Sequence, residues 1–550
     1  MIPPSISLSD LHQRINEVTR FLSATLSIAN AHTVEFYTHD VWSRFVAVKP
    51  EEVLTAFDTG GHKREPEIQK QTEQSRNTFG FCQDTNRLVD APELLRAAKA
   101  HSLPALRVCM SRDQLLEALR QKPSELGAET GVEYEPDEFM NTKKSHEVQS
   151  MAEVVDCLAK HCGVKQVIDV GSGKGYLSSF LSLQHGLRVF GIDSSSTNTH
   201  GAQERNRKLK KFSKAYQKCR NASKEIEKKP VVTDIKVAEY KDALQEPHTP
   251  DLNPIEDFFF NAMSLEATQS ERASTRSLTD EERERRKQEN LERKAQSRNG
   301  VTGAVFSPLT SYVTAETELK ELIDELEDAV LVGLHTCGDL ASSTLRMFTA
   351  KTELLAVCSV GCCYNKLTEE FEPIAKVSQD SFGFPLSQHL RSHSWFCGRN
   401  ARMSACLALE RVTEGHGIQM ESLFYRAVLH VILRDHYGAY KSDKRVGNVY
   451  AKAKSFVDYV RRALRKLDLD NAQLSDNEIK QYHDTHLPRW PEIHAFNLLK
   501  VTLAPCIEGL ILLDRLCYLK EQDAGSFSAL VQLFDPLLSP RCYAIVALKA

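Results

Sequence analysis

The first 140 residues carry apolar side chains at helical spacing. One group of apolar residues recurs at steps of three and four, which places its members on one helix face: Leu8, Leu11, Ile15, Val18, Leu22 and Leu26. Further along, Ser111 to Gln114 precedes the run LLEAL and has the form of a capping box, which marks the start of a helix. These patterns predict an N-terminal helical domain over residues 1–140.

After residue 150, short apolar runs alternate with amphipathic helices. Such alternation is typical of an α/β fold whose parallel sheet is built from strand–helix–strand units. The last strand pair is predicted to be an antiparallel hairpin, because SALVQLFD and CYAIVALK are joined by the turn PLLSPR. The strands expected before that hairpin are Gln166–Val170, Arg188–Asp193, Ser311–Thr314, Ala329–His335 and Leu354–Val360.

Two insertions interrupt the predicted sheet domain, which comprises residues 141–219 and 301–550. Residues 220–300 are polar and highly charged, so they bury too little apolar surface to offset the entropy of ordering. We predict a disordered insertion or a lone helix there. Residues 400–525 contain long apolar-striped helices, including Leu423–Leu433, Phe456–Leu467 and Phe496–Leu519, and form a helical insertion before the hairpin. A short helix carrying Leu319, Leu322, Ile323 and Leu326 is predicted before the strand at Ala329.

Composition indicates a folded protein without a strong global charge. The chain has 550 residues, of which 41% are hydrophobic and 26% charged, close to globular averages. Its formal net charge of −4 exerts no general attraction on nucleic acid or anionic lipid. Fourteen cysteines, including the adjacent Cys362 and Cys363, favour reduced thiols and hence the cytoplasm or the nucleus.

No membrane association is predicted. The amino terminus lacks the basic and apolar regions of a secretory signal. The most apolar stretch, Thr502–Leu519, contains Glu508 and Asp514, so it is interpreted as a core helix.

A glycine-rich turn gives the most specific indication of a ligand site. Gly171, Gly173 and Gly175 follow a buried strand and lead directly into the helix YLSSFLSL. Glycine allows a tight turn and a close approach of the backbone to a ligand. Asp169, two positions upstream, is poorly suited to a pyrophosphate but well suited to an ammonium group. The three glycines also have the spacing G-x-G-x-G, which differs from the G-x-G-x-x-G of dinucleotide sites.

A second carboxylate, Asp193, ends the next strand and is placed to accept hydrogen bonds from both hydroxyls of a ribose. An adenosine with a positive, phosphate-free substituent fits both acids, and S-adenosylmethionine is such a molecule. The alternatives are a purely structural turn and a nicotinamide-dependent oxidoreductase, which needs the longer glycine spacing.

The chain resembles the methyltransferase-like protein 25 family in several motifs. These are VIDVGSGKGYLS, RVFGIDSS, LVGLHTCGDLA, VGCCYNKL and LFDPLLSPR, together with TVEFYTHDVW and KKSHEV. The resemblance spans most of the chain and implies a Rossmann-like, class I S-adenosylmethionine-dependent methyltransferase with a seven-stranded sheet. It assigns the cofactor-binding role to Asp169, Gly171, Gly173, Gly175 and Asp193, and it names no substrate.

Candidate catalytic residues follow two later strands, because ligands in open α/β sheets lie at the carboxyl ends of the strands. His335 is a candidate base near neutral pH, and Asp339 is a candidate to hold or deprotonate an acceptor. Tyr364 is a candidate to stack on a planar base or to donate a hydrogen bond. Alternatively, Asp339 caps the following helix and His335 bonds to nearby backbone. Cys337, Cys358, Cys362 and Cys363 lack paired C-x-x-C spacing, so buried small hydrophobes are predicted and no metal site.

The methyl acceptor is not determined by the sequence, although RNA is slightly favoured over protein. Residues Arg205–Lys229 contain 11 Lys or Arg and two Glu, and they predict a basic helix that binds RNA phosphates or is simply solvated. The H-x-C-G and Cys-Cys motifs also resemble those of transfer-RNA acceptor-stem methyltransferases. The alternative function is a catalytically inactive methyltransferase fold acting as an RNA-binding or scaffold protein.

Overall fold

The computed structural model describes residues 6–60, 77–120, 140–209, 306–373, 381–407 and 420–438, and most of residues 446–549. The predicted charged insertion at 220–300 lies outside these residues, as does most of the predicted basic helix. The domain boundaries proposed from the sequence stay predictions.

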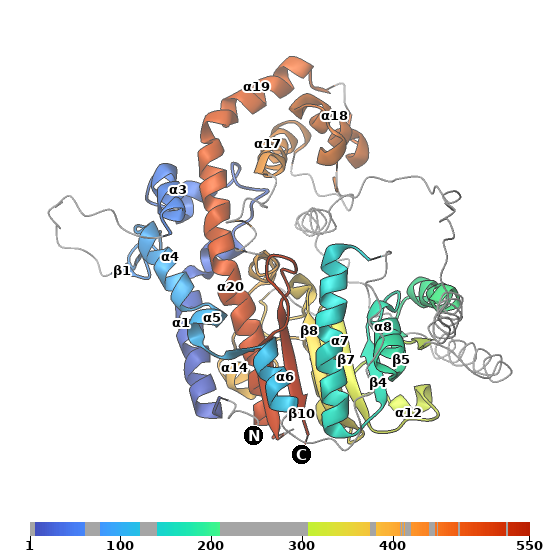
Figure 1. Ribbon diagram of the computed structural model, residues 1–550. Helices are drawn as coiled ribbons and strands as arrows, with labels where there is room; N and C mark the ends of the chain where they lie inside the picture. The colour runs from blue at the N-terminus through green and yellow to red at the C-terminus, as the bar shows by residue number, and fades with distance from the viewer. Residues whose placement is uncertain are drawn as a thin grey trace, which may run out of the picture.

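A mixed sheet of eight strands forms the centre of the molecule, in the order β3-β9-β10-β8-β7-β4-β5-β6 (Figure 1). Neighbouring strands are parallel except around β10, which runs antiparallel to both β8 and β9. This confirms the Rossmann-like α/β fold and the terminal hairpin. The strands are β3 (Cys109–Ser111), β4 (Gln166–Val170), β5 (Arg188–Asp193), β6 (Ser307–Thr310), β7 (Ala329–Thr336), β8 (Leu354–Gly361), β9 (Phe527–Gln532) and β10 (Tyr543–Leu548).

The sheet differs from the prediction at both of its edges. The strand expected at Ser311–Thr314 lies at Ser307–Thr310 and contains Pro308. Because β6 is an edge strand, a proline without an N–H is tolerated there. At the other edge, β3 from the N-terminal segment adds an eighth strand parallel to β9, and its three residues are too few for a recognisable period.

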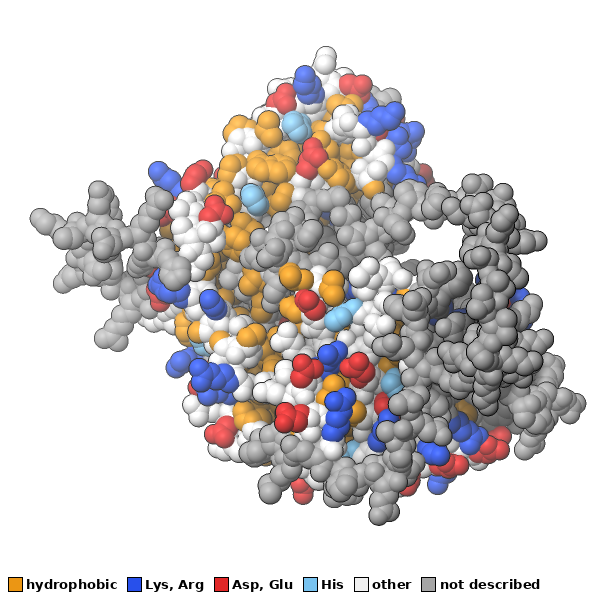
Figure 2. Space-filling model, in the orientation of Figure 1, with side chains coloured by type: hydrophobic (Ala, Val, Ile, Leu, Met, Phe, Trp, Pro, Cys, Tyr) orange, Lys and Arg blue, Asp and Glu red, His pale blue; other side chains and the backbone are white. Residues whose placement is uncertain are grey.

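Helices cover both faces of the sheet, and each face has its own apolar core. On one side lie α6 (Arg112–Arg120), α7 (Thr142–Cys162) and α8 (Tyr176–His185), which share a core with Val167 of β4. On the other side lie α13 (Asp339–Ala350) and α20 (Trp490–Glu521), which share a core with the next residue, Ile168. Successive strand residues thus point to opposite cores, as the two-residue strand period requires. Acidic and basic side chains mix over α6 and α7 (Figure 2).

Sequence patterns anticipated several helices well. Ser111 and Gln114 exchange the reciprocal capping-box bonds at the start of α6, at 3.2 and 2.9 Å. The helix predicted through Leu326, however, is only α12 (Leu319–Leu322). The acidic residues at 324, 325, 327 and 328 follow directly, and negative charge is unfavourable at a helix C-terminus.

The long helix α20 is a core helix. One helical stretch, Asp476–Glu521, has the length and apolarity to cross a membrane, but 94% of its most apolar window is buried within the protein. The N-terminal helices α1 (Leu8–Asn30), α3 (Pro50–Asp58) and α4 (Ala91–Ala100) pack directly against α20.

Other helices and strands within the described residues lie outside the sheet and its covering helices. They are α2 (Val41–Phe45), α5 (Leu103–Leu106), α14 (Gln388–Ser392), α15 (Arg399–Ser404), α17 (Met420–Tyr437), α18 (Phe456–Leu467), α19 (Asp476–His486), the short helices η2 (Tyr364–Lys366), η3 (Tyr450–Lys452) and η5 (Leu487–Arg489), and a hairpin of β1 (Asn77–Thr78) and β2 (Phe81–Cys82).

The strand order places a topological switch point between β4 and β7. From β4 the chain proceeds outward to β5 and β6, whereas β7 and β8 extend the sheet in the opposite direction. Connections that diverge in this way leave a crevice at the carboxyl ends of the two central strands. The glycine turn follows β4 and His335 lies near the end of β7, so both lie at this end of the sheet.

A buried carboxylate lies under the glycine turn. Asp169 of β4 is only 1% exposed, and its Oδ2 accepts a hydrogen bond of 2.6 Å from Ser178 Oγ in α8. Burial raises the pKa of Asp169 to about 7, against the effect of the Ser178 bond and with a further contribution from the charge of Asp193. The fold therefore favours the protonated form of this side chain.

We predict that Asp169→Asn flattens the pH dependence of stability between pH 4 and 7. In this window the unfolded chain has lost the Asp169 proton while the folded chain keeps it, so the free energy of unfolding falls as pH rises. Since each pKa unit corresponds to about 1.4 kcal/mol, the fall amounts to at most about 4 kcal/mol. Urea unfolding of both proteins at several pH values measures this, and equal slopes would contradict the assignment.

Candidate active site

The glycine turn after β4 is held in a left-handed conformation and presents one open position. Gly171, Gly173 and Gly175 have φ values of 72°, 56° and 71°. A Cβ on Gly175 would lie 2.1 Å from Cζ of Phe306, so that glycine is required for packing, whereas nothing lies within 4 Å of a Cβ on Gly173. The turn therefore offers bare backbone to a ligand at Gly173.

Asp193, at the end of β5, lies directly against this turn. Its Oδ2 accepts a hydrogen bond of 2.9 Å from the backbone N–H of Gly173. Its Oδ1 accepts from the N–H of Ser195 at 2.8 Å and from Nδ2 of Asn198 at 3.1 Å. An ionised carboxylate has about four acceptor sites, so one remains for a ligand hydroxyl, and a second hydroxyl must replace one of the existing bonds.

These features fit an adenosine with a positive substituent. The acid for a ribose and the open backbone of the turn are adjacent, as the sequence predicted. Asp169, by contrast, lies beneath the turn and bonds to Ser178, so its observed contact shapes the turn. Its predicted contact with an ammonium group stays a prediction.

His335 forms a buried polar chain with two residues from other elements. Its Nε2 lies 2.9 Å from Oε2 of Glu147 in α7, and Oε1 of Glu147 accepts a 2.6 Å hydrogen bond from Ser539 Oγ in the turn before β10. Burial opposes the charge of Glu147, but the hydrogen bond and charge of His335, aided by Lys143, lower the pKa of Glu147. The imidazole is half-exposed and oriented by an ionised carboxylate, an arrangement suited to a base.

Glu147 was not among the residues predicted from the sequence. It belongs to the KKSHEV motif, but its sequence separation from His335 is 188 residues, and nothing local couples the two. The buried position of a glutamate amid the apolar residues of α7 was the available indication.

Asp339 and Tyr364 lie in structural networks. Both oxygens of Asp339 accept hydrogen bonds from Thr368, one from its N–H at 2.8 Å and one from its hydroxyl at 2.9 Å. Burial raises the pKa of Asp339 despite these bonds. The alternative role as helix cap is wrong, because Gly338 occupies the N-cap and Asp339 is the first helical residue.

Tyr364 is buried and does not face a ligand crevice. It is 2% exposed, and its hydroxyl donates a 2.8 Å hydrogen bond to Glu508 of α20. Glu508 in turn pairs with the buried Arg541 at 2.7 Å. The ring is therefore packed in the core, where it is not accessible to a planar acceptor in this structure, and its hydroxyl bonds to the protein itself.

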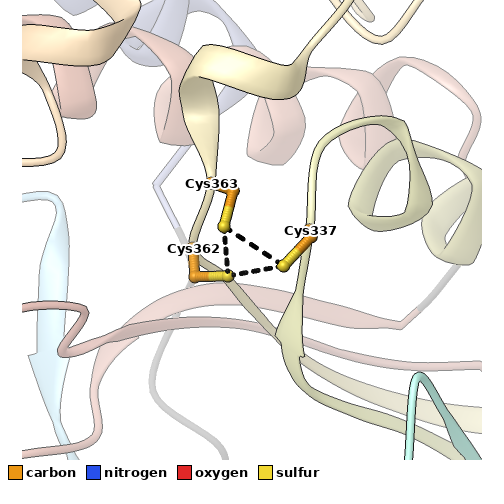
Figure 3. A group of neighbouring side chains, drawn as sticks. All are labelled: Cys337, Cys362 and Cys363. Atoms are coloured by element: carbon orange, nitrogen blue, oxygen red, sulfur yellow. Dashed lines mark hydrogen bonds between the residues drawn. The ribbon is translucent and has the colours of Figure 1, made fainter. Parts of the chain in front are cut away.

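Three cysteine thiols meet at the ends of β7 and β8. The Sγ atoms of Cys337, Cys362 and Cys363 point toward one another, at 3.1, 3.2 and 3.3 Å (Figure 3). Hydrogen bonds from the other two thiols lower the pKa of Cys337 and raise that of Cys362. Cys337 is exposed, contrary to the prediction of a buried small hydrophobe, whereas Cys358 on β8 is buried as predicted.

Basic side chains gather beside the glycine turn. Lys144 Nζ lies 4.1 Å from the ring centroid of Tyr176, and the Arg205 guanidinium lies 4.0 Å from the same centroid. Burial lowers the pKa of Lys144, with the charges of Lys174 and Arg205 adding to the effect and Glu147 opposing it. The predicted basic helix is described only to residue 209, so its remainder lies outside the described residues.

Comparisons with known proteins give a matching domain model and relatives that are similar along the full chain. A family model described as a methyltransferase domain matches residues 143–370, which include the glycine turn, Asp193 and His335. The chain is 44% identical to "Probable methyltransferase-like protein 25" of Homo sapiens over 605 aligned positions, which cover 100% of this chain and 98% of that protein. It is also 44% identical to the Mus musculus protein of the same name, with the same shares covered. No solved structure matches. The chain belongs to the methyltransferase-like protein 25 family.

Proposed function

We propose that this protein transfers a methyl group from S-adenosylmethionine to an acceptor bound at the carboxyl ends of β4 and β7. The observation that carries the proposal is the contact between Asp193 and the N–H of Gly173, which puts a ribose-binding acid beside an open glycine backbone. Asp193 and Gly173 would hold the adenosine, with Gly171 and Gly175 fixing the turn. The cofactor, when bound, supplies an already activated methyl group.

The chain's own contribution is to align an acceptor and to take its proton. Alignment converts a bimolecular transfer into a step within one complex, which accounts for most of the expected acceleration. His335 is the residue proposed to accept the proton, and Glu147 is the positioning residue that orients the imidazole through Nε2. Asp339 and Tyr364 have no place in this step, because their polar atoms are held by Thr368 and Glu508.

RNA is the favoured acceptor class. Lys144, Lys174 and Arg205 lie around the start of α8, beside the glycine turn, and are suited to phosphates of a polyanionic acceptor. Since the chain has a net charge of −4, this attraction is local. We also propose a cytoplasmic or nuclear location, supported by the free cysteines of the described residues, which suit a reducing compartment.

Substitution of the glycine turn or Asp193 is predicted to abolish cofactor binding. Gly173→Arg fills the open position, and Asp193→Ala removes the ribose acceptor. Each should weaken S-adenosylmethionine binding by at least about 100-fold, or about 2.8 kcal/mol, in isothermal titration calorimetry.

The matched control is Gly186→Arg at the other end of α8. Gly186 has a φ of 66°, and nothing lies within 4 Å of a Cβ built on it. The substitution therefore has a conformational cost similar to that of Gly173→Arg, but it lies away from the glycine turn. Unchanged affinity in both Gly173→Arg and Asp193→Ala would refute the cofactor site.

Variants of the His335–Glu147 pair are predicted to separate catalysis from binding. His335→Asn should lower the rate of methyl transfer by about 10²–10⁴-fold, the usual contribution of a positioned acid–base group. Glu147→Gln should lower it by a smaller factor, and cofactor affinity should stay unchanged in both. Glu153→Gln on the same helix is the control, because that side chain is half-exposed. A wild-type rate of methyl transfer in His335→Asn would show that His335 does not accept the proton.

The acceptor class is tested with labelled cofactor and two cellular pools, total RNA and RNA-free protein extract. RNA as acceptor predicts label that is lost on ribonuclease treatment and reduced in a Lys144→Glu, Arg205→Glu variant. Label in protein alone would exclude RNA. Transfer to neither pool, with cofactor binding intact, would favour the inactive scaffold.

A further inference from the structure

We infer that Cys337, Cys362 and Cys363 form a binding site for a single thiophilic metal ion of the zinc type at the carboxyl ends of β7 and β8. The inference rests on the mutual position of three thiols, and neither the cofactor site nor methyl transfer enters it. The three residues come from two strands that are neighbours in the sheet. Figure 3 shows their side chains converging on one point.

The sulfur separations suit one ion. Zinc binds thiolate sulfur at about 2.3 Å, so a tetrahedral site holds neighbouring sulfurs about 3.8 Å apart. The observed distances of 3.1–3.3 Å therefore need to widen by about 0.5–0.7 Å, which small rotations of the side chains allow. Iron–sulfur clusters of the [2Fe–2S] and [4Fe–4S] types are usually held by four cysteines, one more than converge here.

The ligand chemistry selects the ion. Three thiolates form a soft donor set, which favours zinc or copper(I) over magnesium, calcium or manganese. Among the described residues, no His, carboxylate or fourth thiol joins the group within 4.8 Å of all three sulfurs. A zinc ion here thus keeps a fourth position for water or another ligand, as zinc sites with three protein ligands do.

The surroundings provide access on one side and support on the other. Cys337 is exposed, Cys362 is half-buried and Cys363 is buried, so the ion enters from the side of Cys337. In the thiol form, the backbone carbonyl oxygen of His335 accepts hydrogen bonds from Sγ of Cys337 at 3.4 Å and of Cys362 at 3.5 Å, which brings these two sulfurs together. Binding of the ion replaces the thiol protons, which are released to solvent. Cys406 donates to the carbonyl of Cys362 at 3.7 Å, which helps to hold that backbone in place.

A disulfide is the competing explanation for such close sulfurs. Cys337 and Cys362 lie 3.1 Å apart, and oxidation would join them at the expense of any metal. The two explanations differ in the oxidation state of the isolated protein, so one preparation distinguishes them.

The metal content of the full-length chain tests the inference. The protein is prepared with zinc in the growth medium, with a phosphine reductant and without chelators, and zinc is measured by mass spectrometry of the elements. About one zinc ion per chain is expected, with a drop to a small fraction of that value in Cys337→Ser, Cys362→Ser and Cys363→Ser. The control is Cys157→Ser on α7, a half-buried thiol outside the cluster, which should leave the content unchanged.

A second measurement on the wild-type chain does not depend on the folding of variants. Cobalt replaces zinc, and three thiolates give an intense near-ultraviolet charge-transfer band; bound zinc also protects Cys337 from alkylation, as peptide mapping would reveal. Zinc content no higher than in the triple serine variant, or a mapped Cys337–Cys362 disulfide in the reduced preparation, would overturn the inference. Cofactor calorimetry on the same sample reports the glycine turn separately, so failure of one site is not mistaken for failure of the other.

Discussion

The hydrogen bond between the N–H of Gly173 and the carboxylate of Asp193 is the contact on which the site depends. It ties the turn after β4 to the end of β5, and two further bonds, from Gly171 and Ser172 to the carbonyl of Ile192, fix the same junction. A left-handed turn costs little only with glycine, and a buried carboxylate needs hydrogen-bond donors. The glycine turn supplies a donor to Asp193, and Asp193 in turn helps to hold the glycine turn in place. Without the glycine turn Asp193 would lose one of its three donors, and without Asp193 the turn would lose one of the three bonds that join it to the end of β5.

The remaining architecture brings other groups to that junction. Because the chain diverges after β4, the end of β7 lies next to the glycine turn, and a Cβ on Gly171 would come within 3.1 Å of Leu340 in the first turn of α13. The same geometry leaves Asp339 facing Thr368 and draws Tyr364 under α20. Position at a strand end is therefore necessary for a role in the crevice but insufficient, since the side chain's direction depends on what packs beyond the sheet.

Sequence reasoning succeeded where structure is decided locally. The strands β4 and β5 and the helix α18 have the predicted bounds, because each is set by a short apolar period and by glycine, serine or acidic residues at its ends. It failed where distant segments decide. The strand β6 was predicted too far along the chain, at Ser311–Thr314. Its actual position includes Pro308, which is tolerated because β6 lies at the edge of the sheet, and which strand lies at the edge depends on the whole sheet. The contacts of Glu147 with His335 and of Cys337 with Cys362 could not be predicted for the same reason. Sequence periodicity does not relate residues on different elements.

His335 links the imidazole and the thiol cluster through its backbone. Its φ of 64° is unusual for a residue with a side chain and costs roughly 1–2 kcal/mol. The hydrogen bond to the ionised Glu147 contributes about 1.5–3 kcal/mol, enough to offset that cost. The left-handed turn sends the ring toward α7 while the carbonyl oxygen of the same residue accepts from Cys337 and Cys362. The backbone conformation of His335 therefore contributes to two arrangements. It orients the candidate base, and it places a carbonyl oxygen beside the sulfurs of Cys337 and Cys362. A side chain unable to bond to Glu147 would lose the contact that offsets the cost of this backbone conformation.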